Sequence, residues 1–200
     1  MAAHKDNTPI PAEELIPEQL TIESLREAAA GCKACDLWKK ATQTVFGEGE
    51  TNSRLMLVGE QPGDHEDIEG HPFVGPAGRI LDEAFEAAGI ARDEVYLTNV
   101  VKHFRWEQRG KRRLHSKPSQ VHVRACRPWL MAELETVAPR LMVLLGATAA
   151  QSVMGSTFKV PSSVARSSTL RLGCRCSPPS IHRRSCGRLT TKHVERQWRA

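Results

Sequence analysis

"SRLMLVGEQPGDHEDIEGHPFVGPAGRILDEAFEAAG", residues 53–89, runs from a short apolar segment through a loop of glycine, proline and acid into a segment with helical spacing. The apolar "SRLMLVGE" at its start suits a buried strand. A helix is predicted from Pro76 to a stop at Gly89, with its apolar residues at Ile80, Leu81, Ala84, Phe85 and Ala88. A strand followed by a loop and a helix is the repeating unit of a parallel sheet that helices cover.

The same unit recurs further along the chain. Two more buried strands are predicted, "EVYLTNVVKH" at 94–103 and "PRLMVLLG" at 139–146. Ser119 can cap a helix over 119–137, and we expect Pro128 to kink or divide it. Shorter helices are predicted over 17–31 and 147–155. We therefore predict an α/β fold with three α/β/α layers around a central parallel sheet.

In such a sheet, ligands bind at the carboxyl ends of the strands. Three loops would share that rim: 59–78, 99–118 and 146–148. The first of them has glycines that let the backbone approach a ligand, with carboxylates directly after a strand. It lacks the Lys-Ser/Thr ending of a P-loop and the glycine spacing of a dinucleotide site, which argues against both kinds of nucleotide site. The alternative is an acidic surface loop.

Length and composition predict one globular domain, because the 200 residues are 40% hydrophobic. We divide the chain into a leader and N-terminal helix (1–30), the domain (31–160) and a tail (161–200). The chain has no run of about 18 apolar residues, and its first residues lack the order of a secretory signal. We expect a cytoplasmic monomer without a membrane partner.

The net charge of +5 is unevenly placed. The tail has eight Arg and one Lys against one Glu, a net of +8, so residues 1–160 carry 5 − 8 = −3. One basic cluster remains in the domain, around a single acid at Glu107; its members are Lys102, Arg105, Arg109, Lys111, Arg112, Arg113 and Lys117. A polyanion site in the domain is expected at this cluster.

Six cysteines in a reducing compartment are poor disulfide candidates, so they are either metal ligands or buried free thiols. Cys32 and Cys35 form a C-x-x-C pair, which places two thiolates one turn apart. A distant cysteine and an imidazole can complete a four-ligand shell.

Residues 59–79, together with "VYLTNVVKH", "ACRPWL" and "LLGATAA", resemble the iron–sulfur uracil-DNA glycosylases over residues 31–160. The inserted "GKRRLH" at 110–115 resembles the branch called UdgX, which becomes covalently bonded to uracil-containing single-stranded DNA. The resemblance implies a DNA-repair enzyme, a hydrolase of N-glycosyl bonds, with a [4Fe–4S] cluster. Its ligands would be Cys32, Cys35, His103 and Cys126. From the residues alone, zinc bound by the same four side chains remains the alternative.

The resemblance also assigns the substrate contacts. Phe73 would stack on uracil and Asn99 would read its amide edge, since an amide offers both a donor and an acceptor. Gly63 and His71 would line the same pocket. The alternatives are core packing for Phe73 and a strand-end cap for Asn99.

The resemblance makes His115 the nucleophile that captures C1′ of the sugar once the glycosidic bond breaks. Glu60 would stabilise the cationic sugar, with Gln61 and Asp64 in the same pocket. Arg113 would contact phosphates or hold the loop. The alternatives are a solvated histidine, and a metal-stabilised module that binds single strands without cleaving a bond.

The tail departs from the family, which has a fourth strand and a His-Pro-Ser motif there. Read in a shifted frame, "SPPSIHRRSCG" at 177–187 can give "ATIHPSSVLR". Our hypothesis is a one-nucleotide frameshift near Val160, which replaces the last strand with non-native sequence and excludes the tail cysteines as ligands. The chain would then be an inactive copy or a protein that tolerates the loss.

Overall fold

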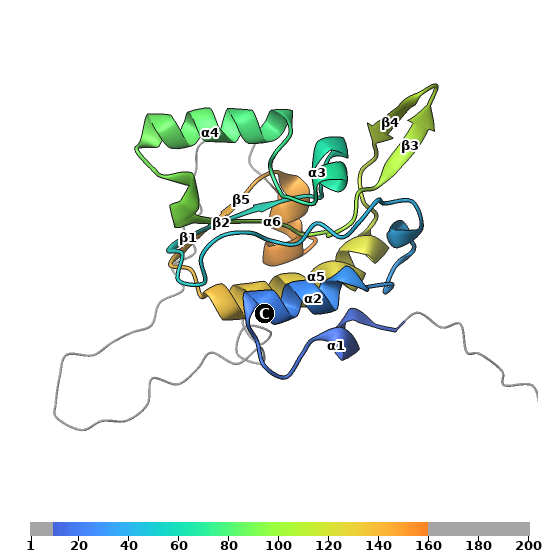
Figure 1. Ribbon diagram of the computed structural model, residues 1–200, viewed down its shortest axis with the longest axis horizontal. Coiled ribbons are helices and arrows are strands. Elements are labelled where there is room, and N and C mark those ends of the chain that lie inside the picture. Colours follow the sequence, from blue (N-terminus) through green and yellow to red (C-terminus); the bar gives the residue numbers. More distant parts are fainter. Residues whose placement is uncertain (1–9, 160–200) are drawn as a thin grey trace, which may run out of the picture.

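A computed structural model describes residues 10–159 as a parallel three-stranded sheet between layers of helices (Figure 1). The strand order is β2-β1-β5, with β1 (Leu55–Gly59) in the centre between β2 (Val95–Asn99) and β5 (Leu141–Leu144). Both pairings are parallel, and the register places Gly59 opposite Asn99 at the carboxyl ends of β1 and β2. The predicted α/β class and central parallel sheet are therefore confirmed.

The side chains of β1 point to both faces of the sheet, and each set packs against a different layer of helices. Met56 and Val58 point into a core shared with the long helix α5 (Gln120–Val137), whereas Leu57 points into a second core with Phe85. Phe85 belongs to α4 (Pro76–Ala88), on the opposite face of the sheet (Figure 1). Alternate strand residues face opposite sides, so one apolar run supplies both cores.

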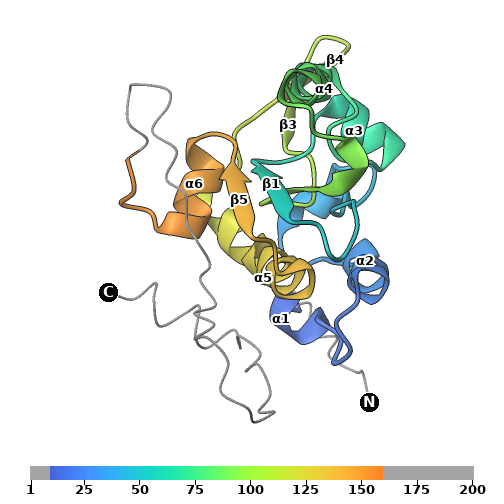
Figure 2. The ribbon, with the colours of Figure 1, turned by 90° about the vertical axis from the view of Figure 1, so that its left-hand side faces the viewer.

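Three further helices cover the α5 side and the sheet edge. α2 (Ile22–Ala30) and α1 (Ala12–Leu15) pack against α5, and α6 (Ala147–Met154) lies beside β5 (Figure 2). α2 begins after Thr21, whose side chain accepts a hydrogen bond from the backbone of Ser24. No helix in residues 10–159 is long and apolar enough to cross a membrane.

The spacing of apolar residues in α4 predicted a wider buried face than the helix has in the structure. Phe85 is buried, but Ile80 is 68% exposed, and Ala84 and Ala88 are also exposed. The helix contacts the sheet through a narrow strip, so helical spacing identified the helix correctly while overstating what it buries.

Of the two effects predicted for Pro128, a kink or a division of the helix, the division does not occur. α5 continues for 18 residues with Pro128 inside it. Proline removes one helical hydrogen bond. Buried side chains on both sides of it, including Cys126, Trp129 and Leu130, pack into the cores and keep the helix continuous.

The basic loop is a hairpin, which the sequence did not predict. β2 ends at Asn99, four residues earlier than expected. Two antiparallel strands follow, β3 (Trp106–Arg109) and β4 (Arg112–His115), and Gly110 adopts a φ of +59° at their two-residue turn. The hairpin extends from the sheet beside α3 (Asp64–Glu69) (Figure 1).

Two short 3-10 helices complete the described elements, Asp36–Lys39 and Arg92–Glu94. The predicted tail, with its frameshift and its lost strand, lies outside the described residues, as do residues 1–9. The domain boundaries therefore stay predictions.

Candidate active site

At the carboxyl ends of β1 and β2, the side chains of Asn99 and Phe73 lie close over Gly59. A Cβ atom added to Gly59 would lie 2.3 Å from Asn99 Oδ1 and 2.9 Å from Phe73 Cζ. Glycine is therefore required here, because any side chain would displace the amide and the ring. The structure brings Phe73 and Asn99 together, as both assigned roles need.

Phe73 has a φ of +57°, which is costly for a residue with a side chain. Two neighbours maintain this conformation. A Cβ at Gly78 would overlap the carbonyl of Phe73, and Arg92 Nη2 donates to that carbonyl at 3.0 Å. Arg92 is itself paired with Asp82 on α4 at 2.5 Å. The ring position is thus set by residues that sequence reasoning did not single out.

The hairpin has two chemically different faces. Trp106 pairs with His115 and Gln108 with Arg113 in the antiparallel register, so these four share one face. The other face holds the pairs Glu107 with Leu114 and Arg109 with Arg112. We call these the inner and outer faces, because Arg113 turns toward α3 whereas Arg109 and Arg112 are exposed.

His115 lies opposite Glu60. Its Nε2 is 3.9 Å from Glu60 Oε1, and the two side chains are 51% and 26% exposed. The ring of Phe104 is 6.1 Å from the imidazole, tilted by 45°. An accessible imidazole next to a carboxylate provides a nucleophile and a group that stabilises positive charge. The structure thus places His115 and Glu60, two residues of the predicted site, next to each other.

Arg113 anchors the hairpin. Its Nε is 2.5 Å from Asp64 Oδ1 and its Nη1 is 2.7 Å from Asp67 Oδ2, while the guanidinium lies 5.6 Å from the ring centres of both Phe104 and Trp106. Of the two roles expected for Arg113, these contacts match holding the loop. The same contacts pair the Asp64 carboxylate with Arg113.

Gln61 and Gly63 bind backbone and side chains of the protein itself. The Gln61 amide donates to the carbonyls of Arg105 and Ser116 and accepts from the Arg105 N–H, so it joins both ends of the hairpin. Gly63 N–H donates to the buried Glu66 carboxylate at 2.9 Å. Both residues shape the loop around Glu60.

Fewer cations of the basic cluster are exposed than the sequence suggests. Lys102 is 1% exposed and paired with Glu133, Arg113 is bound to α3, and Arg105 donates to the carbonyl of Lys117. The exposed cations are Arg109, Lys111, Arg112 and Lys117. A polyanion would therefore meet the outer face and the turn of the hairpin.

The four predicted ligands are buried or half-buried near α5. The neighbouring Cys126 side chain lowers the pKa of Cys35 to about 7, whereas Cys35 and burial raise the pKa of Cys126. Burial lowers the pKa of His103 to about 4, so its imidazole is neutral at pH 7. His103 Nε2 pairs with the Thr44 hydroxyl, and its buried Nδ1 has no partner within the described residues.

Cys32 is buried and accepts from Trp129 Nε1 at 3.4 Å. Across residues 10–159, no three His, Cys, Asp or Glu side chains are placed to hold a single metal ion. Three thiols and an unpartnered neutral imidazole nitrogen nevertheless form a donor set suited to a thiolate-bound metal group.

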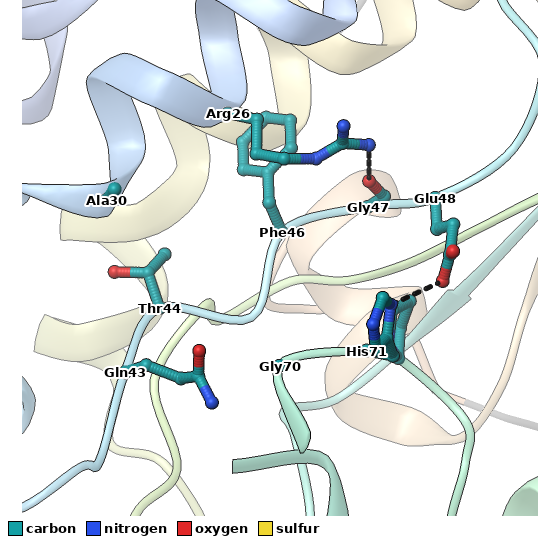
Figure 3. Close-up of a pocket in the computed structure, with 10 residues that line it drawn as sticks. Arg26, Ala30, Gln43, Thr44, Phe46, Gly47, Glu48, Gly70 and His71 are labelled. Atoms are coloured by element: carbon teal, nitrogen blue, oxygen red, sulfur yellow. Dashed lines mark hydrogen bonds and ion pairs between the residues drawn. The ribbon is translucent and has the colours of Figure 1, made fainter. Parts of the chain in front are cut away.

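His71 lines a hollow together with Glu48 and Gly70 (Figure 3). Its Nδ1 is 3.3 Å from Glu48 Oε2, and the hollow, of about 340 Å³, extends to Arg26 and Phe46. Its lining does not include Glu60, Phe73, Asn99 or His115. The place of His71 in the uracil pocket therefore stays a prediction.

Sequence reasoning missed three residues that support the site, Phe104, Trp106 and Thr42, and counted Asp67 only among the carboxylates that follow the first strand. Thr42 donates from both its backbone and its hydroxyl to Asp67, the buried partner of Arg113. The one available signal was the alternation of Trp106, Gln108 and then Arg113, His115 around a glycine, which is the pattern of a hairpin.

Comparison with known proteins agrees with this geometry. Residues 46–197 match the family model of the uracil DNA glycosylase superfamily. The chain belongs to this superfamily. Type-4 uracil-DNA glycosylases from Sulfurisphaera tokodaii and Thermotoga maritima are 37% and 40% identical to it, over 69% and 64% of this chain and 61% and 63% of their own. A type-5 uracil-DNA glycosylase from Pyrobaculum aerophilum is 28% identical over 66% of this chain and 61% of its own.

The chain thus spans about three fifths of the length of these superfamily relatives.

Proposed function

We propose that the protein is a uracil-DNA glycosylase that takes uracil out of single-stranded DNA, cleaves its N-glycosidic bond and becomes linked to the sugar C1′ through His115. The observation that carries the proposal is His115 facing Glu60 at 3.9 Å, beside the end of β1. The superfamily match and the names of the relatives support uracil excision. One chain holds every proposed site residue, which agrees with a monomer.

The proximity of Phe73 and Asn99 over Gly59 supports base recognition. A base stacked on the Phe73 ring would present its amide edge, where uracil and cytosine differ, to the Asn99 amide. Extrusion costs least when the base is already unpaired, which favours single-stranded DNA.

Glu60 and His115 support the bond changes. The C1′–N1 bond breaks with its electron pair on uracil, and the cationic sugar is stabilised by the Glu60 carboxylate. The lone pair of a neutral His115 nitrogen then forms the new bond to C1′. The resulting imidazolium loses its remaining N–H proton, and the uracil anion gains one. In a hydrolytic turnover, water replaces His115 at this step.

Cys32, Cys35, His103 and Cys126 would hold a [4Fe–4S] cluster. A zinc ion binds all four donors at about 2.0–2.3 Å, so they must surround one point. A cluster takes one protein ligand per iron and accepts donors that are further apart, which fits the placement of these four side chains better. The cluster would stabilise the packing of α5 against the N-terminal segment.

A second candidate is a metal-stabilised module that binds single strands without cleavage, and the exposed cations of the hairpin favour it equally. A denaturing gel separates the two. The purified chain is mixed with uracil-containing single-stranded DNA and boiled. A slow band supports covalent trapping, and a free abasic product supports hydrolysis.

The alternative that this chain is an inactive copy needs one more sample. A version with the reading frame restored after residue 159 is run beside it. A band with the restored version alone identifies the present chain as inactive, and intact DNA with both, with binding retained, supports the non-catalytic module.

A further inference from the structure

A buried ion pair lies directly behind the base-reading end of β2. Lys102 Nζ is 2.5 Å from Glu133 Oε2, and the two side chains are 1% and 0% exposed. Removing two charges from water is expensive, and such a pair is often no more stable than apolar side chains of similar volume. Stability alone is therefore a weak reason for this arrangement.

The pair belongs to a network with close geometry. Glu133 Oε1 accepts from the Tyr96 hydroxyl and from the backbone of Gly47, each at 3.1 Å, and from Thr98 Oγ1 at 2.9 Å. A Cβ at Gly47 would lie 2.3 Å from that oxygen. The carboxylate thus accepts hydrogen bonds from three groups besides Lys102.

Lys102 connects this network to the proposed base-reading residue. Its Nζ donates to the backbone carbonyl of Asn99 at 2.7 Å and to Thr98 Oγ1 at 2.7 Å. The carbonyl fixes the orientation of the peptide plane from which the Asn99 side chain extends over Gly59. Discrimination between two bases needs that amide to be placed within a fraction of an ångström.

We propose that Lys102 and Glu133 are positioning residues for base discrimination: they act through the Asn99 carbonyl and never touch the DNA. The inference rests on the proposed function. It predicts that loss of the pair impairs reading of uracil while leaving binding of the DNA backbone intact.

The test is a paired substitution, Lys102→Met with Glu133→Leu, which leaves no unpaired buried charge. We expect the rate of uracil excision or trapping to fall by about 10- to 100-fold, the size of effect that a displacement near the reacting groups produces. Inhibition by free uracil weakens as well. Affinity for a single strand with an abasic-site analogue, which has no base to read, stays within about twofold.

Tyr96→Phe is the matched control, because it removes one bond to Glu133 and none to Asn99. It is expected to keep the wild-type rate and its response to free uracil. If the paired variant does not fold, Thr98→Val removes one partner of Lys102 with little change of volume, and a smaller loss in the same direction is expected.

A folded paired variant, or Thr98→Val in its place, with the wild-type rate and uracil inhibition overturns the inference. An equal loss of affinity for the abasic-site analogue also overturns it, since that marks general damage. Failure of the proposed function is a different result: the wild-type chain itself then neither excises nor traps uracil.

Discussion

Arg112 and Arg113 are consecutive residues of one strand, yet the hairpin uses them for opposite purposes. Arg113 is held on the inner face by two carboxylates and two aromatic rings. Arg112 is exposed on the outer face, opposite Arg109. Successive residues of a strand point to opposite faces. One basic run can therefore anchor the hairpin through its inner face, which carries His115, and attract phosphates through its outer face.

The largest expected effect comes from the inner face. His115→Ala removes the proposed nucleophile, so the boil-resistant band with uracil-containing DNA is expected to disappear entirely. The measurement is the denaturing gel described above, with His65→Ala as the matched control because His65 is an exposed histidine of α3 without a role in the proposed site. A persistent band with His115→Ala would assign the linkage to another residue.

Arg113→Ala is expected to have the second-largest effect. It leaves the Asp67 carboxylate, which is 0% exposed, without its cation and is expected to lower the free energy of unfolding by about 2 kcal/mol. The trapping rate is expected to fall by about 100-fold, because His115 loses its fixed position. Thermal unfolding and single-turnover trapping measure both. An unchanged rate would show that the inner face does not place the histidine.

Arg112→Ala tests the outer face and leaves the anchor intact. We expect weaker binding of single-stranded DNA, with the slope of log affinity against log salt reduced by about 0.7, the value for one phosphate contact. The trapping rate at saturating DNA is expected to stay near that of the wild type. A salt titration in a fluorescence-anisotropy assay gives the slope. Loss of rate without loss of affinity would contradict the division into two faces.

The smallest effect is expected from Glu107→Gln. This removes an acid from the outer face, so affinity for single-stranded DNA is expected to rise by less than about threefold at low salt and to be unchanged at high salt. Glu107 also accepts from the Ser116 hydroxyl, and glutamine keeps an acceptor for that bond. A fall in affinity would exclude the outer face as the phosphate-binding surface.

The sequence predicts elements that depend on local spacing better than elements that depend on contacts between residues far apart in the chain. The strand before the Gly59 loop and the helix after Pro76 follow from local periodicity, and both are present. The hairpin escapes prediction because its inner face is anchored by Asp67, 46 residues away from Arg113, and its apolar contacts are partly replaced by a stacked guanidinium.

The partners of charged side chains were harder to predict from the sequence than the helices and strands. Lys102 looks like one more member of a basic cluster, but its partner Glu133 is 31 residues away on α5, and nothing near Lys102 in the chain reveals that pairing. The proximity of Asn99, Phe73 and Gly59 likewise depends on register. The roles assigned to these site residues came from family resemblance, which supplied long-range information that spacing lacks.

The amide of Gln61 has a mechanical consequence. It binds the chain where the hairpin leaves and where it returns, and it is the residue next to Glu60. Gln61 therefore links the loop that carries the Glu60 carboxylate to the hairpin that carries the His115 imidazole. A displacement of the hairpin would therefore pull on the loop that carries Glu60, so the Gln61 bonds favour a constant separation of Glu60 and His115.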